Sequence, residues 1–145
     1  MNFSNPDNTI IRQLLANTKT IAVVGLSPKP NRPSYQVSRA MQEYGYRIIP
    51  VRPAVDEVLS ETCYASLYDI PDLQQIDLVD VFRAPQHVDA IVDACIELQL
   101  PAIWLQDGVI NESAAQRALD AGITVVMDRC VYRDYIQMGL ADPLS

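Results

Sequence analysis

A chain of 145 residues, 49% hydrophobic and 20% charged, has the length and composition of one globular domain with a buried core. Its formal net charge of −7 argues against a nucleic-acid partner, because no cluster of lysines or arginines offsets the repulsion of a polyanion. Apolar runs stay below the ~20 residues of a membrane span, and the N-terminus lacks a secretory pattern. Three cysteines without CxxC spacing indicate neither a disulfide framework nor a metal site. We expect one cytoplasmic domain over residues 1–145, with its core at about 18–138 and no membrane association.

The first predicted elements are a short helix and a strand. Asn5 has the pattern of an N-cap before a helical first-position proline, and the helix ends near Asn17. Thr20–Val24 is a continuous apolar run, which is typical of a strand covered on both faces. This strand stops at Gly25.

A second helix and a second strand follow a proline-rich loop. Ser34 is predicted to cap the helix, and Gly45 stands where a left-handed C-terminal residue belongs. Arg47–Val51 is the next predicted strand, with Pro50 expected to interrupt its ladder near the end. The stretch after it is irregular, with a short edge strand expected around Cys63–Tyr64.

The rest of the chain alternates in the same way. Its predicted strands are Asp77–Phe82, Ala102–Leu105 and Thr124–Met127. Its predicted helices are one opened by Pro85, one capped by Asn111 and ended by Gly122, and one after Cys130. Strands alternating with helices form right-handed βαβ units. We therefore predict a single three-layer α/β domain with a doubly wound, Rossmann-like parallel sheet of about five to six strands.

The carboxyl edge of such a sheet is where a ligand is expected, at the point where the strand order reverses. If the first strand lies between the second and the Asp77–Phe82 strand, four chain segments converge there. These segments contain Gly25, Leu26, Ser27, Pro28, Val51, Arg52, Pro53, Phe82, Arg83, Trp104 and Gln106.

The turn after the first strand contains a single glycine, Gly25, where a dinucleotide fingerprint requires GxGxxG. The sequence therefore disfavours a full NAD clamp. A phosphate still has partners, because the next helix presents free backbone N–H groups near Ser34 and Tyr35, and Arg32 adds a charged donor.

The second strand ends at Arg52, where an NAD-binding domain places an acid for the ribose hydroxyls. A guanidinium at this position suits an adenosine whose ribose is phosphorylated. Coenzyme A and NADP both have such a phosphate, so the charge alone does not choose between them. Of the apolar candidates, Phe82 fits a core residue and a cofactor wall equally well, and Trp104 fits packing better than contact. Gln106 is better placed to reach a ligand.

Groups for catalysis are few. His87 is the sole histidine, and the sequence spacing indicates no serine or cysteine nucleophile to pair with it. It is interpreted as a surface or capping residue. Cys130 follows Asp128 and Arg129, which would suit a reactive thiol, although cysteines are more often buried and inert. Asp80 is expected to accept backbone or cofactor hydrogen bonds. No catalytic residue is assigned.

Several motifs in order along the chain resemble the small CoA-binding domain family, which is similar to the nucleotide-binding domain of the succinyl-CoA synthetase alpha subunit. The resemblance runs from about Thr18 to Tyr135. The motifs are Ile21–Ser27 with Arg32–Tyr35, Tyr44–Val51, Asp80–Arg83, Ile103–Gln106 and Val125–Cys130. The chain differs from the usual family residues at Arg52 (usually Asn), Ser60 (Gly), Asp107 (apolar) and Tyr132 (Lys).

This resemblance implies that coenzyme A lies between the first glycine turn and the end of the second strand. By similarity, the residues around its phosphates are Gly25, Leu26, Ser27, Pro28, Arg32, Ser34 and Tyr35. Val51, Arg52 and Pro53 would flank the adenosine, and Phe82 and Arg83 would form the other wall. We expect a non-catalytic module for coenzyme A or an acyl-CoA, open to recognition by a protein partner. The alternative is a small NADP-dependent or thiol-reactive enzyme with the same nucleotide site.

Overall fold

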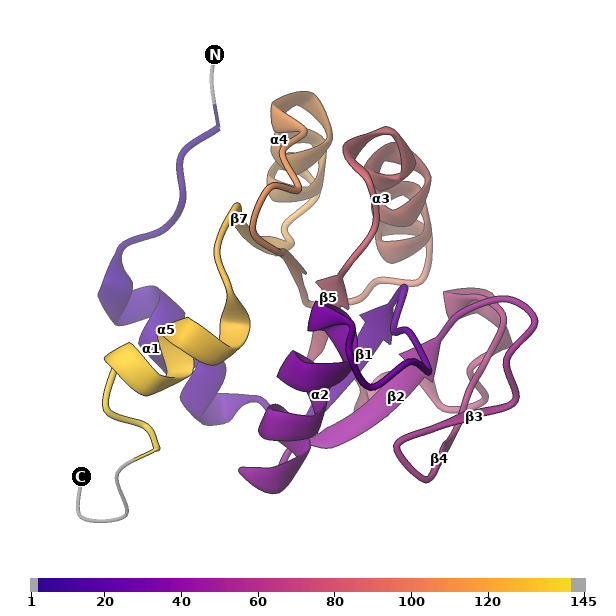
Figure 1. Ribbon diagram of the computed structural model, residues 1–145. Coiled ribbons are helices and arrows are strands. Elements are labelled where there is room, and N and C mark those ends of the chain that lie inside the picture. The colour runs from indigo at the N-terminus through magenta and orange to yellow at the C-terminus, as the bar shows by residue number, and fades with distance from the viewer. Residues whose placement is uncertain (1–2, 142–145) are drawn as a thin grey trace.

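The computed structural model describes residues 3–141 and contains a five-stranded parallel sheet between two layers of helices (Figure 1). The strand order is β2-β1-β5-β6-β7, so the chain reverses direction across the sheet after β2. This order confirms the doubly wound Rossmann-like fold, with the first strand beside both the second and the third of the long strands. The strands are β1 (Thr20–Val24), β2 (Arg47–Val51), β5 (Leu78–Val81), β6 (Ala102–Leu105) and β7 (Thr124–Met127).

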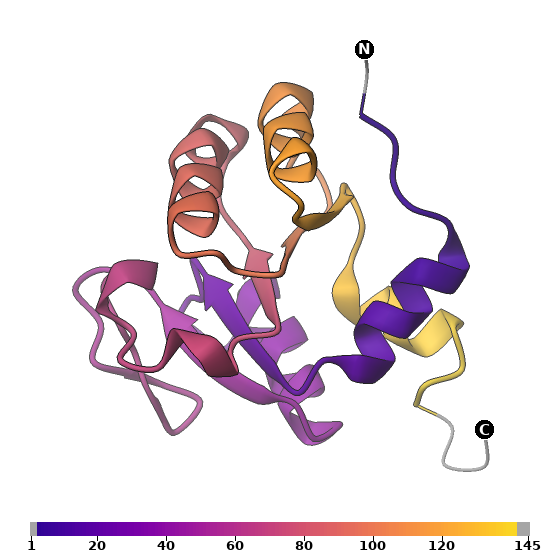
Figure 2. The same cartoon turned by 180° about the vertical axis from the view of Figure 1, so that it is seen from behind.

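The helices cover both faces of the sheet, as the front and back views show (Figures 1 and 2). One face carries α3 (Val88–Glu97) and α4 (Glu112–Asp120). The other carries α1 (Asn8–Asn17), α2 (Pro33–Glu43) and α5 (Val131–Gln137). The buried apolar residues form two clusters, one on each side of the sheet, which explains why the strands are nearly continuous apolar runs.

The segment between β2 and β5 forms a small hairpin and two short turns. The hairpin pairs β3 (Glu57–Val58) with β4 (Glu61–Thr62) in antiparallel orientation, and it is followed by the 3-10 turns η1 (Leu67–Asp69) and η2 (Leu73–Gln75). Leu59 and Ser60 both have positive φ, 55° and 64°, as a tight two-residue hairpin requires. A glycine, which the resemblance implies for position 60, would fit this conformation.

The predicted edge strand around Cys63–Tyr64 is wrong in extent. Only a single parallel bridge joins Tyr64 to Val51, with hydrogen bonds from Tyr64 N to Pro50 O (3.0 Å) and from Arg52 N to Tyr64 O (2.8 Å). Pro50 lies within β2, at the edge of the main sheet, where a strand tolerates the loss of a backbone donor.

The N-terminus of α1 differs from the sequence prediction. Asp7 is the N-cap, and its carboxylate accepts a hydrogen bond from Ile10 N. Asn5 instead exchanges two hydrogen bonds with the backbone of Met127, through its Nδ2 (2.9 Å) and its Oδ1 (2.7 Å). The tertiary contact with β7 therefore removes Asn5 from the cap position.

The start of α2 also corrects a prediction. Arg32 occupies the N-cap position without a side-chain hydrogen bond, and Pro33 begins the helix. Because the fixed φ of Pro33 suits a first helical residue, the helix begins two residues earlier than expected, and the Ser34 hydroxyl binds elsewhere. Pro85 likewise opens a 3-10 turn, η3 (Pro85–His87), that leads into α3. The predicted Asn111 cap is confirmed by its hydrogen bond with Ala114 N.

Residues 3–141 contain neither a helix that could cross a membrane nor a cluster of metal ligands. Within this range no helix is both long and apolar enough to cross a bilayer. No group of three histidine, cysteine, aspartate or glutamate side chains in the same range is arranged to hold a metal ion. All three cysteines are free; Cys63 and Cys95 are buried and Cys130 is half-buried.

Candidate functional site

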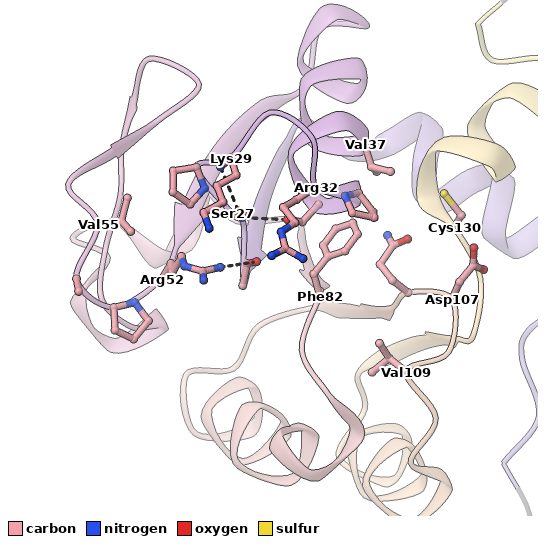
Figure 3. A pocket seen from close by; sticks show the side chains of 17 residues that line it. Ser27, Lys29, Arg32, Val37, Arg52, Val55, Phe82, Asp107, Val109 and Cys130 are labelled. Carbon is pink, nitrogen blue, oxygen red and sulfur yellow. Dashed lines mark hydrogen bonds between the residues drawn. The ribbon is translucent and has the colours of Figure 1, made fainter.

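A cleft of about 1010 Å³ lies beyond the carboxyl ends of the strands (Figure 3). Segments that follow β1, β2, β5, β6 and β7 all contribute to its wall. The sequence-predicted residues that line it are Gly25, Ser27, Pro28, Arg32, Ser34, Arg52, Pro53, Phe82 and Gln106. The cleft therefore stands at the edge that the topology of the sheet indicates.

Gly25 is the point at which three strand ends meet. Its N–H donates to Val51 O at 2.8 Å, and its φ is 87°. A Cβ atom at this position would lie 2.5 Å from the carbonyl oxygen of Phe82 and 2.9 Å from Cδ of Arg83. Glycine is thus required here both by its backbone conformation and by the close approach of the chain after β5.

The loop between β1 and α2 is held by its own hydrogen bonds. Ser27 N donates to Ser34 Oγ at 2.9 Å, and Lys29 N donates to Ser27 Oγ at 3.1 Å. The N–H groups of Ser34 and Tyr35, in the first turn of α2, donate to no residue that the structure describes. Free amides in the first turn of a helix favour an anion at this end of the cleft.

Three cations line the same end of the cleft, Lys29, Arg32 and Arg52 (Figure 3). Arg52 Nη1 donates to Gly25 O at 3.4 Å, which holds the guanidinium at the junction of β1 and β2. In a protein with a net charge of −7, this grouping gives the end of the cleft near α2 a local positive charge.

The opposite end of the cleft is lined by Asp107, Val109 and Cys130, with Phe82 between the two ends (Figure 3). Arg133 forms a bidentate pair with Asp107, at 2.9 and 2.8 Å, and this pairing lowers the pKa of the Asp107 carboxyl. The acid is therefore neutralised by a partner on α5. This end of the cleft offers apolar surface, a thiol and polar groups in place of free cations.

Asp80 lies beneath the cleft, on β5, with 2% of its surface exposed. Gln106 Nε2 donates to Asp80 Oδ1 at 2.5 Å. Burial raises the pKa of Asp80 to about 7, although the hydrogen bond from Gln106 and the backbone N–H of Val81 act in the opposite direction. Sequence reasoning expected a backbone or cofactor donor for Asp80, whereas the hydrogen bond found among the described residues comes from the side chain of Gln106.

Five predicted residues do not line the cleft: Leu26, Tyr35, Val51, Arg83 and Trp104. Leu26, Val51 and Trp104 are buried in the two apolar clusters, where the alternation of side chains along the strands and their extensions directs them. Trp104 Nε1 donates to Arg129 O at 2.8 Å, which confirms its packing role. Tyr35 packs against the cluster beside α2, and Cδ of Arg83 lies next to Gly25.

The cleft also contains residues that sequence reasoning left out of the predicted site. Lys29 was detectable as a cation between the glycine and α2. Val55, Val109 and Cys130 reach the cleft only through the tertiary course of their loops. Phe82 satisfies both alternatives, since it lines the cleft and also packs against the apolar cluster.

Comparison with known proteins decides the family. A family model described as a CoA binding domain matches residues 19–135. The chain belongs to this CoA-binding domain family. The match spans every strand of the main sheet and every residue that lines the cleft.

Two relatives are similar to this chain over nearly their whole length. The CoA-binding domain is 42% identical over 127 residues to the uncharacterized protein YneT of Bacillus subtilis, covering 88% of this chain and 93% of YneT. A hypothetical protein from Pyrococcus horikoshii superposes with a TM-score of 0.86 at 35% identity, covering 94% of this chain and 98% of that one.

A larger protein contains a similar segment. The CoA-binding domain is 28% identical over 81 residues to acetate–CoA ligase [ADP-forming] II of Archaeoglobus fulgidus, which is 54% of this chain. It spans only 12% of the length of that ligase.

Proposed function

We propose that this protein binds coenzyme A or an acyl-CoA in the cleft at the carboxyl edge of its sheet and acts as a non-catalytic binding module. One observation carries the proposal: Lys29, Arg32 and Arg52 gather with the free amides of α2 at one end of a cleft whose other end is uncharged or neutralised. Coenzyme A has the same polarity, with a phosphorylated nucleotide at one end and an uncharged arm at the other.

The size of the cleft supports a large ligand. At about 1010 Å³ it is at the upper end of the range of ~300–1,000 Å³ that ligand pockets occupy. Arg52 also stands where a domain that binds unphosphorylated ribose needs an acid. Both features favour a ligand that is long and carries a phosphate on its adenosine.

The residues of the cleft support binding more than chemistry. Ser27 and Ser34 are engaged in hydrogen bonds that shape the loop, and no general base adjoins them there. His87, the sole histidine, is in η3 and does not line the cleft. A nucleophile with an adjacent base, which most covalent mechanisms require, is therefore not assembled among the described residues.

The test of the proposal is calorimetric titration of the protein and of Arg52→Ala with coenzyme A, its 3′-dephospho form and NADP. We expect Arg52→Ala to weaken coenzyme A binding by about 1–3 kcal/mol, the scale of a charged hydrogen bond, and to leave the 3′-dephospho form little affected. Arg47→Ala is the matched control, because Arg47 is exposed at the opposite end of the same strand.

The outcomes of this titration separate the possibilities. Folded protein that binds none of the ligands overturns the proposal. If Arg52→Ala weakens the binding of coenzyme A and of its 3′-dephospho form equally, the cleft remains the binding site. Arg52 then does not contact the 3′-phosphate. Tighter binding of NADP than of coenzyme A favours a nicotinamide-dependent enzyme.

A second candidate function rests on Cys130, which is half-buried and lines the neutral end of the cleft. A thiol placed there would meet the reactive end of a bound coenzyme A, and this position supports a thiol-reactive enzyme. Such an enzyme would lose its activity on Cys130→Ser. Coenzyme A binding that is unchanged in Cys130→Ser, without turnover in either protein, supports the non-catalytic module.

A further inference from the structure

Gln106 forms a buried hydrogen bond with Asp80, and this bond has no role in the proposed binding of phosphates. Gln106 lines the cleft although only 4% of its surface is exposed, and its Nε2 is held by the buried Asp80. We infer that Asp80 is a positioning residue that fixes the Gln106 amide with its carbonyl oxygen toward the cleft. This oxygen accepts a hydrogen bond from an amide N–H in the uncharged arm of the ligand.

The free oxygen follows from the hydrogen bonds of the described residues. Oε1 of Gln106 accepts no hydrogen bond from any of them. Among these residues the only fully buried side-chain polar atom without a partner is Ser38 Oγ. Because Oε1 of Gln106 also lacks a partner, it is not fully buried. Gln106 lines the cleft, so we infer that the small exposed surface of Oε1 faces the cleft. A nearly buried acceptor without a partner favours a ligand that brings a donor.

Asp80 sets the orientation because a side-chain amide has a donating and an accepting end. At pH 8, above the pKa of about 7 to which burial raises it, the Asp80 carboxyl is ionised and is an acceptor only, so it pairs with the NH₂ group and leaves Oε1 for the ligand. The pairing of β5 with β6 places Asp80 opposite Trp104, two residues before Gln106. This register brings the two side chains together, although they are 26 positions apart in the sequence.

The position of Gln106 in the sheet indicates which part of a ligand it meets. Gln106 follows β6, which is separated from β1 by β5. Two strand spacings, about 10 Å, thus lie between it and the cationic end near Gly25. A coenzyme A whose phosphates occupy that end extends its pantetheine arm, with two amide N–H groups, toward Gln106. This inference rests on the proposed function and names the chemistry of its second subsite.

The experiment compares coenzyme A with adenosine 3′-phosphate 5′-diphosphate, the same nucleotide without the pantetheine arm. We expect Gln106→Met to weaken coenzyme A binding about tenfold, the effect of one lost hydrogen bond, and to leave binding of the truncated nucleotide within about twofold of the wild type. Gln116→Met is the control, because Gln116 is on α4 and outside the cleft.

The role of Asp80 is tested with a disruptive and a conservative variant. Asp80→Leu removes the acceptor for Nε2, and we expect it to weaken coenzyme A binding several-fold while the truncated nucleotide still binds. Asp80→Asn retains an acceptor oxygen and is expected to restore the affinity. The double variant Asp80→Leu/Gln106→Met should bind coenzyme A no more weakly than Gln106→Met, since both changes act through one contact.

A measurement on the wild type keeps the test independent of the folding of Asp80→Leu. The side-chain NH₂ protons of Gln106 are expected to exchange with solvent much more slowly than those of Gln116 in an NMR experiment. Equal exchange rates overturn the positioning role. Normal coenzyme A affinity in Gln106→Met, or equal losses for both ligands, overturns the amide contact. If the wild type binds neither ligand, the proposed function itself fails, which is a distinguishable result.

Discussion

At the scale of single residues, the end of β1 depends on Gly25 for a reason that goes beyond turn flexibility. Gly25 and Gly108 both have positive φ, 87° and 78°. A Cβ atom at Gly108 would have no neighbour within 4 Å, whereas one at Gly25 would meet the Phe82 carbonyl oxygen at 2.5 Å. The two glycines therefore separate the cost of a left-handed backbone from the cost of a steric clash.

Alanine substitutions at these two glycines test this difference. Gly108→Ala is expected to lower the free energy of unfolding by about 1 kcal/mol, the cost of the left-handed conformation alone. Gly25→Ala is expected to cost about 3 kcal/mol or more, because the chain after β5 must also move. Urea denaturation measures both values. Equal losses would show that the approach of Phe82 contributes nothing.

At the scale of the elements, β7 is an edge strand whose outer side pairs with the N-terminal segment at Met127. Asn5 uses both ends of its amide to pair with the backbone N–H and C=O of Met127, at 2.7 and 2.9 Å. Its side chain thus satisfies backbone groups that an unpaired edge would leave open. The segment before α1 is tied to the sheet by this contact, which spans 122 positions of the sequence.

Removal of this contact is expected to loosen the edge of the sheet. Asn5→Ala eliminates two partly buried hydrogen bonds and should lower the free energy of unfolding by about 1–2 kcal/mol. It should also accelerate hydrogen exchange at the Met127 amide. Asn17→Ala, at the exposed end of α1, is the control and should change neither quantity. Unchanged protection of Met127 in Asn5→Ala would contradict the proposed tie.

At the scale of the whole molecule, one buried acid gives the stability an unusual dependence on pH. The pKa of Asp80 is raised to about 7 by burial, whereas an unfolded chain has an aspartate pKa of about 3.9. Between these values the native state retains a proton that the unfolded state has lost. The contribution of Asp80 therefore makes the protein less stable as the pH rises from about 4 to 7, and is constant above that range.

Asp80→Asn is expected to remove this dependence. In the wild type the contribution of Asp80 lowers the free energy of unfolding by up to about 1.4 kcal/mol per pH unit between pH 5 and 7, and the variant should lose that slope. Urea denaturation at several pH values measures the difference. Asp107→Asn should keep the slope, because pairing with Arg133 lowers the pKa of Asp107 and confines its effect to more acidic solutions. An unchanged slope in Asp80→Asn would refute the assignment.

Most of the fold was predictable because the local patterns and the tertiary packing agree. The strands are apolar runs since both faces of the sheet are covered, and Gly45 and Gly122 end their helices with positive φ as expected. The errors occur where a distant partner competes with a local signal. Asn5 resembles a cap but binds β7, and Ser34 resembles a cap but binds Ser27.

The candidate site was predictable in its position and only partly in its members. Topology places Gly25 and Arg52 at one edge without reference to any side chain. Arg52 and Arg83 both follow strand ends, and only Arg52 lines the cleft. Val109 was not assigned to the cleft, since nothing in its local sequence distinguishes it from a core residue. Cys130 was considered as a reactive thiol, but its place in the cleft depends on the course of the loop after β7.

The sequence by itself determined the order of strands and helices, the glycine at the end of β1 and the supply of cations near it. These features depend on local spacing and on residue chemistry. Only the tertiary structure decided which side chains line the cleft. It also placed the buried Asp80 within hydrogen-bond distance of Gln106. The physical reason is that such contacts depend on strand register and loop course, which bring together residues that have no relation in the linear chain.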